Sequence, residues 1–263
     1  MLEIFLYCLP FGVISGVISG LLGVGGGIII VPFLAWLLSL HGMPSETIMQ
    51  TAVATSLATI IVTSASAVLA QHRRGAVDWR VVNALTPGIA IGAWFGADLA
   101  HLLSSSMLAS VFGLFLLING INTALNIKPK PHRQLPKKIT LGFVGSVIGS
   151  FSTLVGIGGG TLTIPYMAWH NVQMKKAIAI GSACAIPIAT FGSLSFIIIG
   201  LQAKFLPTGN LGYINIPAFL GISASSLFAT TLGVHLAHKL STRALKRAFA
   251  VILVVVGLKM LLH

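Results

Sequence analysis

Two glycine clusters with the same downstream pattern are the residues of this chain whose spacing points to chemistry. Gly-Val-Gly-Gly-Gly at 23–27 is followed by Pro32, and Gly-Ile-Gly-Gly-Gly at 156–160 is followed by Pro165. Each cluster interrupts an apolar stretch with backbone that does not favour a helix. A helix that begins just after such a cluster leaves its first N–H groups unpaired and presents the positive end of its dipole. Each cluster therefore predicts a site for a small anion, because glycines let a ligand approach those amides closely.

Hydroxyl and amide side chains near both clusters can add hydrogen bonds to an anion without any buried Lys or Arg. The candidate substrate-binding residues are Gly23, Gly25, Gly26, Gly27, Gly156, Gly158, Gly159, Gly160, Ser19, Gln50, Thr55, Ser56, Thr153, Thr161 and Ser182. The alternative interpretation is that the glycines only let helices pack closely. Two aligned clusters, each followed by an aligned proline, favour the site. A nucleotide-binding loop is not supported, because neither a preceding strand nor a Walker lysine is present.

The composition places both clusters in a membrane. Hydrophobic residues make up 56% of the chain and charged residues 8%, against about 25% charged residues in ordinary soluble domains. Apolar runs long enough to span a bilayer recur along the sequence. They are 4–22, 48–70, 82–100, 107–126, 139–155, 177–201, 213–236 and 244–262, and the shorter runs 28–40 and 161–170 follow the glycine clusters. This pattern predicts an all-α polytopic membrane protein.

The clusters belong to a longer internal repeat. Thr55-Ser56 aligns with Gly181-Ser182, and Ala100-His101 aligns with Ala237-His238. We therefore expect a first transmembrane repeat at 1–126, a Pro-rich basic linker at 127–138, and a second repeat at 139–263. Each repeat has about five apolar segments, one of them short.

The distribution of Lys and Arg among the loops predicts that the two repeats are inverted in the membrane. Loop 71–80 is basic in the first half, whereas loops 170–176 and 237–247, which do not correspond to it, are the more basic ones in the second half. Cytoplasmic loops accumulate Lys and Arg, so the linker 127–138 should be cytoplasmic and both termini external. Five crossings per half, or three crossings plus a re-entrant pair, would produce this inversion. We favour five.

The loop His72-Arg73-Arg74-Gly75-Ala76-Val77-Asp78-Trp79, Ala54-Thr55-Ser56-Leu57 and the two glycine clusters with their prolines give the chain a family resemblance. It resembles the TauE/SafE sulfite-exporter family, also called the toluene sulfonate uptake permeases, over essentially its whole length. The resemblance implies an inner-membrane carrier for small sulfur-containing anions or organic acids. The second half lacks the His-x-x-Gly-x-Val-Asp-Trp pattern, with Gly209 and Tyr213 as its only echoes. That loop is therefore not expected to be half of a symmetric binding site.

Two interpretations remain open for the charged loop at 72–78. His72, Arg73 and Asp78 could form a gate or an anion collector at the cytoplasmic mouth of the pathway. Alternatively, the loop sets topology, with an Asp–Arg pair fixing its turn, and exposed pairs of this kind contribute less than about 1 kcal/mol.

The shortage of acidic residues bears on the energetics of transport. Proton-coupled carriers usually hold Asp, Glu or His deep in the membrane, and Asp and Glu here total 4. We expect export of a sulfur-containing anion such as sulfite, sulfoacetate or another organosulfonate by alternating access, without an obligatory coupling ion. The alternatives are an ion-coupled importer of organosulfur or organic-acid anions, and an anion channel.

A membrane-embedded enzyme is the competing class, and it is disfavoured because the histidines lie in loops or near helix ends, away from the hydroxyls. No metal site and no cofactor are expected, since His235 and His238 have no evident third ligand. The expected partners are a small anionic substrate and the lipid bilayer, with no nucleic acid. The sequence is also compatible with a homo-oligomer. The expected location is the cell inner membrane.

Overall fold

The structure is a computed structural model that describes residues 1–22, 25–125, 134–203, 207–237 and 242–262. Helices account for nearly all of the described chain. They are α1 (Leu2–Leu22), α2 (Gly27–Leu40), α3 (Ile48–His72), α4 (Trp79–Leu102), α5 (Ser105–Ala124), α6 (Lys138–Val155), α7 (Gly160–Trp169), α8 (Met174–Leu201), α9 (Ile216–Ala237) and α10 (Thr242–Leu262). They fall on the ten predicted apolar segments, so the predicted helical class is confirmed. Six of the described helices, α1, α3, α5, α6, α8 and α9, are long and apolar enough to cross a membrane.

Both glycine clusters break the helix, as the sequence predicts. In the first cluster, Gly25 and Gly26 have positive φ values of 81° and 78°, and α2 begins at the next residue. In the second, Gly156 follows α6 with φ 70°, and α7 begins at Gly160. A side chain would be strained at each of these left-handed positions, which explains why glycine occupies them.

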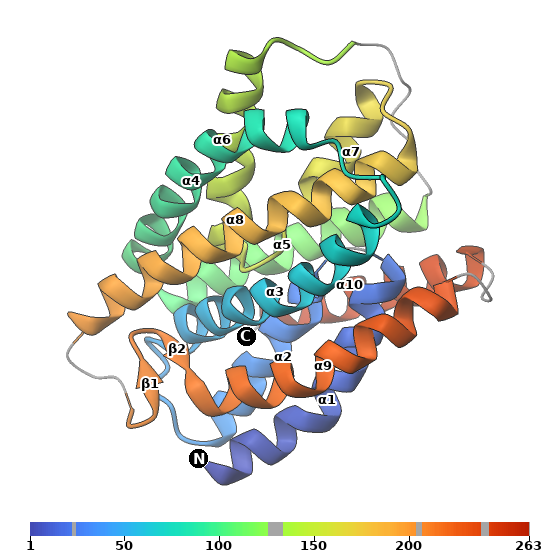
Figure 1. Ribbon diagram of the computed structural model, residues 1–263. Helices are drawn as coiled ribbons and strands as arrows, with labels where there is room; N and C mark the ends of the chain where they lie inside the picture. The colour runs from blue at the N-terminus through green and yellow to red at the C-terminus, as the bar shows by residue number, and fades with distance from the viewer. Residues whose placement is uncertain (23–24, 126–133, 204–206, 238–241, 263) are drawn as a thin grey trace.

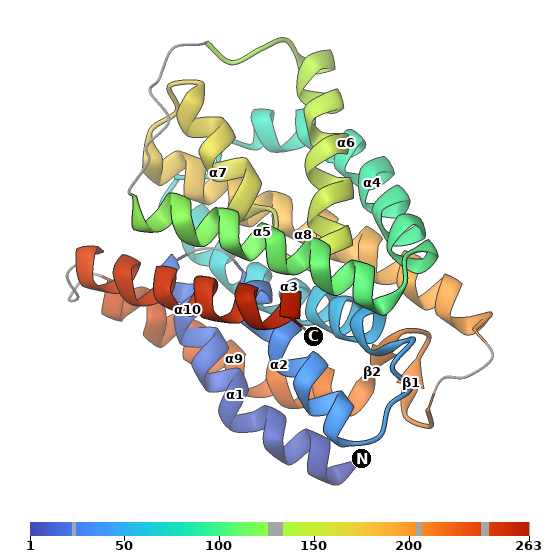
Figure 2. The same cartoon turned by 180° about the vertical axis from the view of Figure 1, so that it is seen from behind.

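The helices pair in a pattern that is unchanged when the first half is exchanged for the second. Helix α1 packs on α9 as α6 packs on α4, and α3 contacts α9 as α8 contacts α4. Helices α3 and α8 pack on each other through the centre (Figure 1), and α5 packs on α10 on the opposite side of the molecule (Figure 2). These pairings agree with the alignment of the two halves, and the repeat organisation stays a prediction.

Glycines outside the clusters account for the closest helix packing. On α4, Cβ atoms built on Gly88, Gly92 and Gly96 would collide with the backbone of α6, and Gly145 and Gly149 on α6 would collide with α4 in turn. Spacing of four residues puts small residues on one helix face and lets two backbones approach. These regularly spaced glycines on α4 and α6 therefore allow close helix packing, in addition to the glycines of the two clusters.

One predicted apolar run does not begin as a helix. Residues 210–215 form a two-stranded antiparallel hairpin of β1 (Asn210–Leu211) and β2 (Ile214–Asn215), so α9 begins at Ile216 rather than at 213. Gly209 and Gly212 have positive φ values of 95° and 54°. These conformations turn the chain back on itself before the helix can start. The fold is therefore helical with one short β element.

Candidate functional site

The two glycine breaks meet in the interior of the molecule. A Cβ atom on Gly27 would lie 2.5 Å from the carbonyl oxygen of Gly156, and one on Gly25 would lie 3.6 Å from the Cα atom of Gly158. Backbone therefore packs directly on backbone where the two halves touch, and a larger residue at Gly27 would force them apart. Gly23 lies outside the described residues.

Both breaks lead into helix starts with unpaired donors. The N–H groups of Gly160, Thr161 and Leu162 have no hydrogen-bond acceptor among the described residues, and the first bond of α7 runs from Thr163 N–H to the Gly159 carbonyl at 2.8 Å. At α2, the N–H groups of Ile29 and Ile30 bond to the Gly26 carbonyl, at 3.0 and 3.1 Å, whereas those of Gly27 and Ile28 have no acceptor among the described residues. Free N–H groups and an aligned helix dipole favour negative charge at such ends.

The central helices α3 and α8 hold the second break in place. Ser56 on α3 donates a hydrogen bond of 2.8 Å to the carbonyl oxygen of Gly156. On α8, a Cβ atom on Gly181 would lie 3.1 Å from the Cα atom of Gly160, so α8 passes beside the start of α7. Ser19 on α1 lies against the first break, with its Cβ atom 3.6 Å from the Cβ position of Gly26.

Several buried hydroxyls around the second break have no hydrogen-bond partner in the described structure. Thr153 in the last turn of α6 and Thr163 in the first turns of α7 are fully buried, and neither hydroxyl oxygen has a partner. The hydroxyl of Thr161 is also buried without a partner. An unsatisfied buried polar group is costly and calls for an explanation such as a ligand. Sequence reasoning selected Thr153 and Thr161.

Sequence reasoning missed Thr163 and the neighbouring helix face of α8. The Cβ position of Gly192 lies 3.1 Å from the Thr153 hydroxyl oxygen, and the next residue, Ser193, is buried with an unpartnered hydroxyl. Hydroxyls at 161, 163 and 193 within apolar runs were the available signal. Their lack of partners depends on the packing of neighbouring helices and is not visible in the sequence.

Three other candidate residues have hydrogen-bond partners elsewhere. The Gln50 amide donates to the carbonyl of Leu103 at 2.9 Å and accepts from Ser105 at 3.0 Å, which joins α3 to the turn before α5. Thr55 accepts the N–H of Asn215 at 2.9 Å. Ser182 donates to the Ile178 carbonyl and accepts from Gln71 Nε2 at 3.3 Å.

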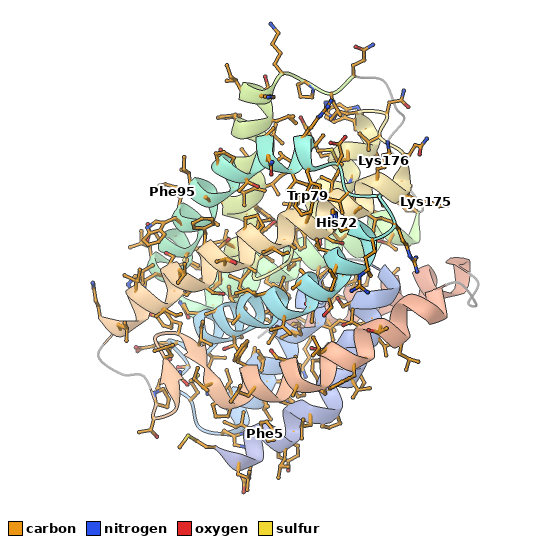
Figure 3. The ribbon with its side chains drawn as sticks, in the orientation of Figure 1. Phe5, His72, Trp79, Phe95, Lys175 and Lys176 are labelled. Atoms are coloured by element: carbon orange, nitrogen blue, oxygen red, sulfur yellow. The ribbon has the colours of Figure 1, made fainter. Side chains whose placement is uncertain are left out.

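The charged loop at 72–78 is exposed, and its contacts are local. The indole N–H of Trp79 donates to Nδ1 of His72 at 3.1 Å, with the two rings arranged edge to face (Figure 3). Asp78 accepts the backbone N–H of Arg80 at 3.1 Å and so caps α4. The Asp–Arg ion pair expected here is absent from the described residues, because that carboxylate serves as a helix cap. Lys175 and Lys176 lie at the same end of the molecule as His72 and Trp79 (Figure 3).

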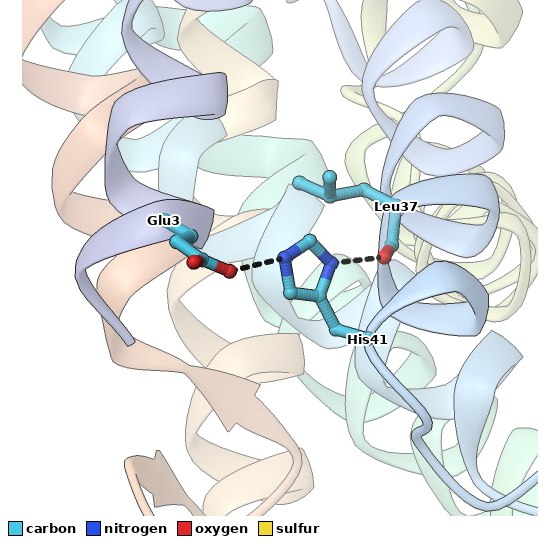
Figure 4. A network of polar contacts seen from close by, with 3 residues as sticks. All are labelled: Glu3, Leu37 and His41. Carbon is cyan, nitrogen blue, oxygen red and sulfur yellow. Dashed lines mark hydrogen bonds and ion pairs between the residues drawn. The ribbon is translucent and has the colours of Figure 1, made fainter.

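A contact between His41 and Glu3 joins the ends of α1 and α2 that lie away from the glycine break (Figure 4). Nδ1 of His41 contacts the Leu37 carbonyl oxygen at 2.9 Å, and Nε2 faces Glu3 at 3.7 Å. A carbonyl oxygen can only accept, so Nδ1 carries the proton in this contact. Because Phe11 on α1 also stacks on Phe33 of α2, the two helices form an antiparallel hairpin whose tip is the first glycine break.

In the second half, the short helix α7 also ends in a histidine. His170 follows α7, and its Nδ1 bonds to the Tyr166 carbonyl at 2.8 Å. Both short helices therefore end in a histidine whose ring binds the carbonyl four residues earlier. A side chain that binds the last carbonyls satisfies acceptors that the helix leaves free.

Formal charge is kept out of the interior. None of the described Lys, Arg, Asp and Glu side chains is buried, and the buried polar residues are Ser, Thr, Asn, Gln and the single histidine His170. The groups around the breaks are thus backbone amides and neutral hydroxyls. Such an arrangement can bind an anion by hydrogen bonds and oriented dipoles, and it offers no group for acid–base or metal chemistry.

Comparison with known proteins agrees with this description. Residues 8–260 match the family described as Sulfite exporter TauE/SafE. A probable membrane transporter protein of Haemophilus influenzae is 33% identical over 265 residues, covering all of both chains. Another from Methanocaldococcus jannaschii is 30% identical and covers 98% of this chain and 97% of its own. A third, from Bacillus subtilis, is 26% identical with the same coverage. No solved structure matches.

The family and the relatives indicate a membrane transporter. The family match covers nearly the whole chain, and a relative matches from end to end. Six described helices are long and apolar enough to span a bilayer, which fits a multi-pass membrane protein. The chain belongs to the TauE/SafE sulfite exporter family of membrane transporters.

Proposed function

We propose that this protein is a secondary transporter that exports a small sulfur-containing anion, sulfite or an organosulfonate such as sulfoacetate, across the cell inner membrane. The observation that carries the proposal is the meeting of the two glycine breaks, at Gly25 and Gly158, beside helix starts with free N–H groups. The anion is held there by those amides and by the hydroxyls of Thr153 and Thr161. The name of the family supports the substrate class.

The proposed topology is two inverted repeats, 1–126 and 139–263, joined by a cytoplasmic linker at 127–138. The contact between Glu3 and His41 supports one part of it, because it lies where the ends of the first hairpin come together. The hairpin of α6 and α7 has its outer ends near Lys138 and Lys175, on the basic side. Because the tips of the two hairpins touch, we now favour re-entrant pairs with three crossings per half over five full crossings.

Alternating access requires contacts between the halves to break on each side in turn. Among the described residues, three direct hydrogen bonds join the halves besides the one from Ser56 to Gly156. Asn215 N–H to Thr55 and the His101–Tyr213 contact, at 2.9 and 3.0 Å, lie toward the external side in this topology. Gln71 to Ser182, at 3.3 Å, lies toward the cytoplasm. We assign these contacts to the external and cytoplasmic gates, with His72, Arg73 and Asp78 at the mouth of the latter.

The direction of transport follows from the membrane potential. Moving an anion out of a cell that is negative inside is favourable by about 2.3 kcal/mol per charge per 100 mV. The described interior offers no buried carboxylate for proton coupling. An ion-coupled importer and an anion channel are the other candidates. Efflux from loaded vesicles that follows an imposed potential and saturates with substrate would support the exporter. Efflux driven only by a pH gradient would contradict uncoupled export.

Replacing Thr153 by Val tests the site directly. Because the Thr153 hydroxyl has no partner in the described protein, we expect the free energy of unfolding to change by less than about 1 kcal/mol. Loss of one hydrogen bond to an anion should weaken sulfite binding about tenfold or more. The measurement is sulfite binding to the purified transporter, with thermal unfolding recorded in parallel.

Thr63→Val is the matched control. Thr63 is also buried, but its hydroxyl bonds to carbonyls of its own helix, at 3.3 Å from both Thr59 O and Ile60 O. We expect this variant to retain sulfite affinity. Equal affinity in the wild type, Thr153→Val and a Gly27→Ala variant that still folds would contradict the proposed site.

A further inference from the structure

The charge on the substrate follows from the absence of formal charge around the breaks. We propose that the transported species is a monoanion and that the site rejects dianions. For sulfite the carried form is therefore bisulfite, and for organosulfonates it is a species with one negative charge. Sulfoacetate carries both a sulfonate and a carboxylate and is a dianion at neutral pH, so this inference removes it from the proposed substrates. This inference rests on the proposed function, since it assumes that the breaks bind the anion.

The first step is the inventory of groups that could neutralise a bound anion. The described Lys and Arg side chains are all exposed, and they lie in loops or near helix ends, as at Arg73, Lys138 and Lys176. His170 is buried at the end of α7, and its Nδ1 already donates to a carbonyl. The breaks lie at the beginning of that helix, ten residues away from its end. No full positive charge in the described structure therefore faces the breaks.

The second step is the strength of the neutral groups around the breaks. A helix start offers a partial charge of about half a unit and a few free N–H groups. The unpartnered hydroxyls of Thr153, Thr161 and Thr163 add neutral donors. Together these groups can replace much of the hydration of one negative charge. They stabilise a second negative charge less well, because each group contributes a dipole rather than a full charge.

The third step compares the cost of burial for the two charge states. Transfer of an ion from water into a medium of low dielectric is expensive, and in the Born description the cost grows with the square of the charge. A dianion therefore costs about four times as much as a monoanion of similar size. The attraction to fixed dipoles grows only in proportion to the charge. The balance therefore favours a monoanion over a dianion of similar size.

The fourth observation is that hydroxyls both donate and accept. A bisulfite ion carries a proton, and a threonine oxygen can accept a hydrogen bond from it while other groups donate to the remaining oxygens. The same hydroxyl can turn its proton toward a sulfonate, which has no donor of its own. A site of amides and hydroxyls therefore suits both candidate substrates, provided that each carries one charge.

The test compares three probes in proteoliposomes. Methanesulfonate is a monoanion across the working pH range, sulfate is a dianion, and sulfite changes from monoanion to dianion near neutral pH. Efflux is followed at matched internal and external pH, from slightly acidic to slightly alkaline, and protein-free vesicles give the background. Methanesulfonate efflux should vary little with pH. Sulfite efflux at constant total sulfite should fall about tenfold per pH unit once the dianion predominates, and sulfate should move about a hundredfold more slowly than methanesulfonate.

The outcomes separate this inference from the proposed function. Sulfite efflux that rises with the dianion fraction, or sulfate efflux as fast as methanesulfonate efflux, would overturn monoanion selectivity and leave the transporter in place. If none of the three anions moves faster than in protein-free vesicles, the proposed substrate class itself is wrong. Thr153→Val should slow methanesulfonate and acidic sulfite alike, which would place the selectivity at the breaks.

Discussion

The connections that precede α4 and α9 occupy matching places in the two halves, yet they are built differently. In the first half, the loop at 73–78 is exposed at residues 73–75 and partly buried at 76–78, and a Cβ atom on Gly75 would meet nothing within 4 Å. In the second half, the hairpin at 210–215 packs into the molecule, with Tyr213 3% and Asn215 4% exposed. The repeat therefore preserves the helices and their pairing, while the two connections have diverged.

The two connections also differ in their hydrogen bonds to the rest of the molecule. The hairpin bonds to α3 through Asn215 and Thr55, and to α4 through Tyr213 and His101. The described loop at 73–78 has no hydrogen bond to the other half. The bond from Trp79 to His72 joins the two residues that flank this loop. In the proposed topology a packed element thus closes the external end, whereas the hydrogen bond that joins the halves at the cytoplasmic end of the described structure runs from Gln71 to Ser182. We infer that the two ends open at different energetic cost.

The largest expected contrast is between two glycines with similar backbone conformation. Gly212 and Gly75 have φ values of 54° and 64°, but a Cβ atom on Gly212 would collide with the carbonyl of Ile197. We expect Gly212→Ala to lower the free energy of unfolding by about 2–4 kcal/mol, from strain and overpacking together. Gly75→Ala should cost about 1 kcal/mol, from strain alone. Thermal unfolding in detergent measures both, and equal losses would show that the hairpin is not tightly packed.

A smaller contrast concerns the residues that cap the two helices. Asn215 accepts the N–H of Ala218 at 3.1 Å in a buried setting and donates to the partly buried Asn210 at 2.8 Å. Asn215→Ala should therefore destabilise by about 1–2 kcal/mol, and Asp78→Ala, at an exposed cap, by about 0.5–1 kcal/mol. Unfolding midpoints of the two variants provide the comparison. A larger loss for Asp78→Ala would reverse the assignment of the hairpin as the more rigid connection.

The smallest effect should come from the aromatic residues. Tyr213→Phe removes the bond to His101 and should cost about 0.5–1.5 kcal/mol, whereas Trp79→Phe, which removes an exposed bond, should cost less than about 0.5 kcal/mol. Burial also raises the pKa of the Tyr213 hydroxyl. The unfolded chain then loses this proton at a lower pH than the folded protein, so stability should fall as pH rises above about 10. Tyr213→Phe should remove that part of the alkaline loss. An unchanged pH profile would contradict it.

The loop and the hairpin also show how far sequence reasoning reaches. Apolar periodicity and length located all ten helices, and the glycine clusters predicted both breaks. The hairpin at 210–215 was missed because its apolar residues continue into α9 without a polar boundary. The weak echo of Gly75 and Trp79 in Gly209 and Tyr213 was the available signal. It could not reveal that Trp79 would be exposed and Tyr213 buried.

Among the candidate site residues, local sequence identified what the backbone must do. Glycine at 25, 26 and 156 is required by left-handed backbone, and the sequence pattern alone predicted a break there. Gln50, in contrast, was selected for its polarity and depth. The structure gives it partners in the turn before α5, because α3 is long enough to carry its first turns away from the breaks. A polar residue within an apolar run is therefore expected to have a hydrogen-bond partner, but the sequence does not identify that partner.

The sequence by itself determined that the chain is a helical membrane protein with two interrupted halves, since composition, run length and glycine content act locally along the chain. Only the tertiary structure decided that the breaks touch, that Ser56 bonds to Gly156, and that the hydroxyls of Thr153 and Thr163 are left without partners. These contacts join residues about a hundred positions apart or depend on three helices at once. They follow from how helix faces pack, and that packing is a property of the whole chain rather than of any segment.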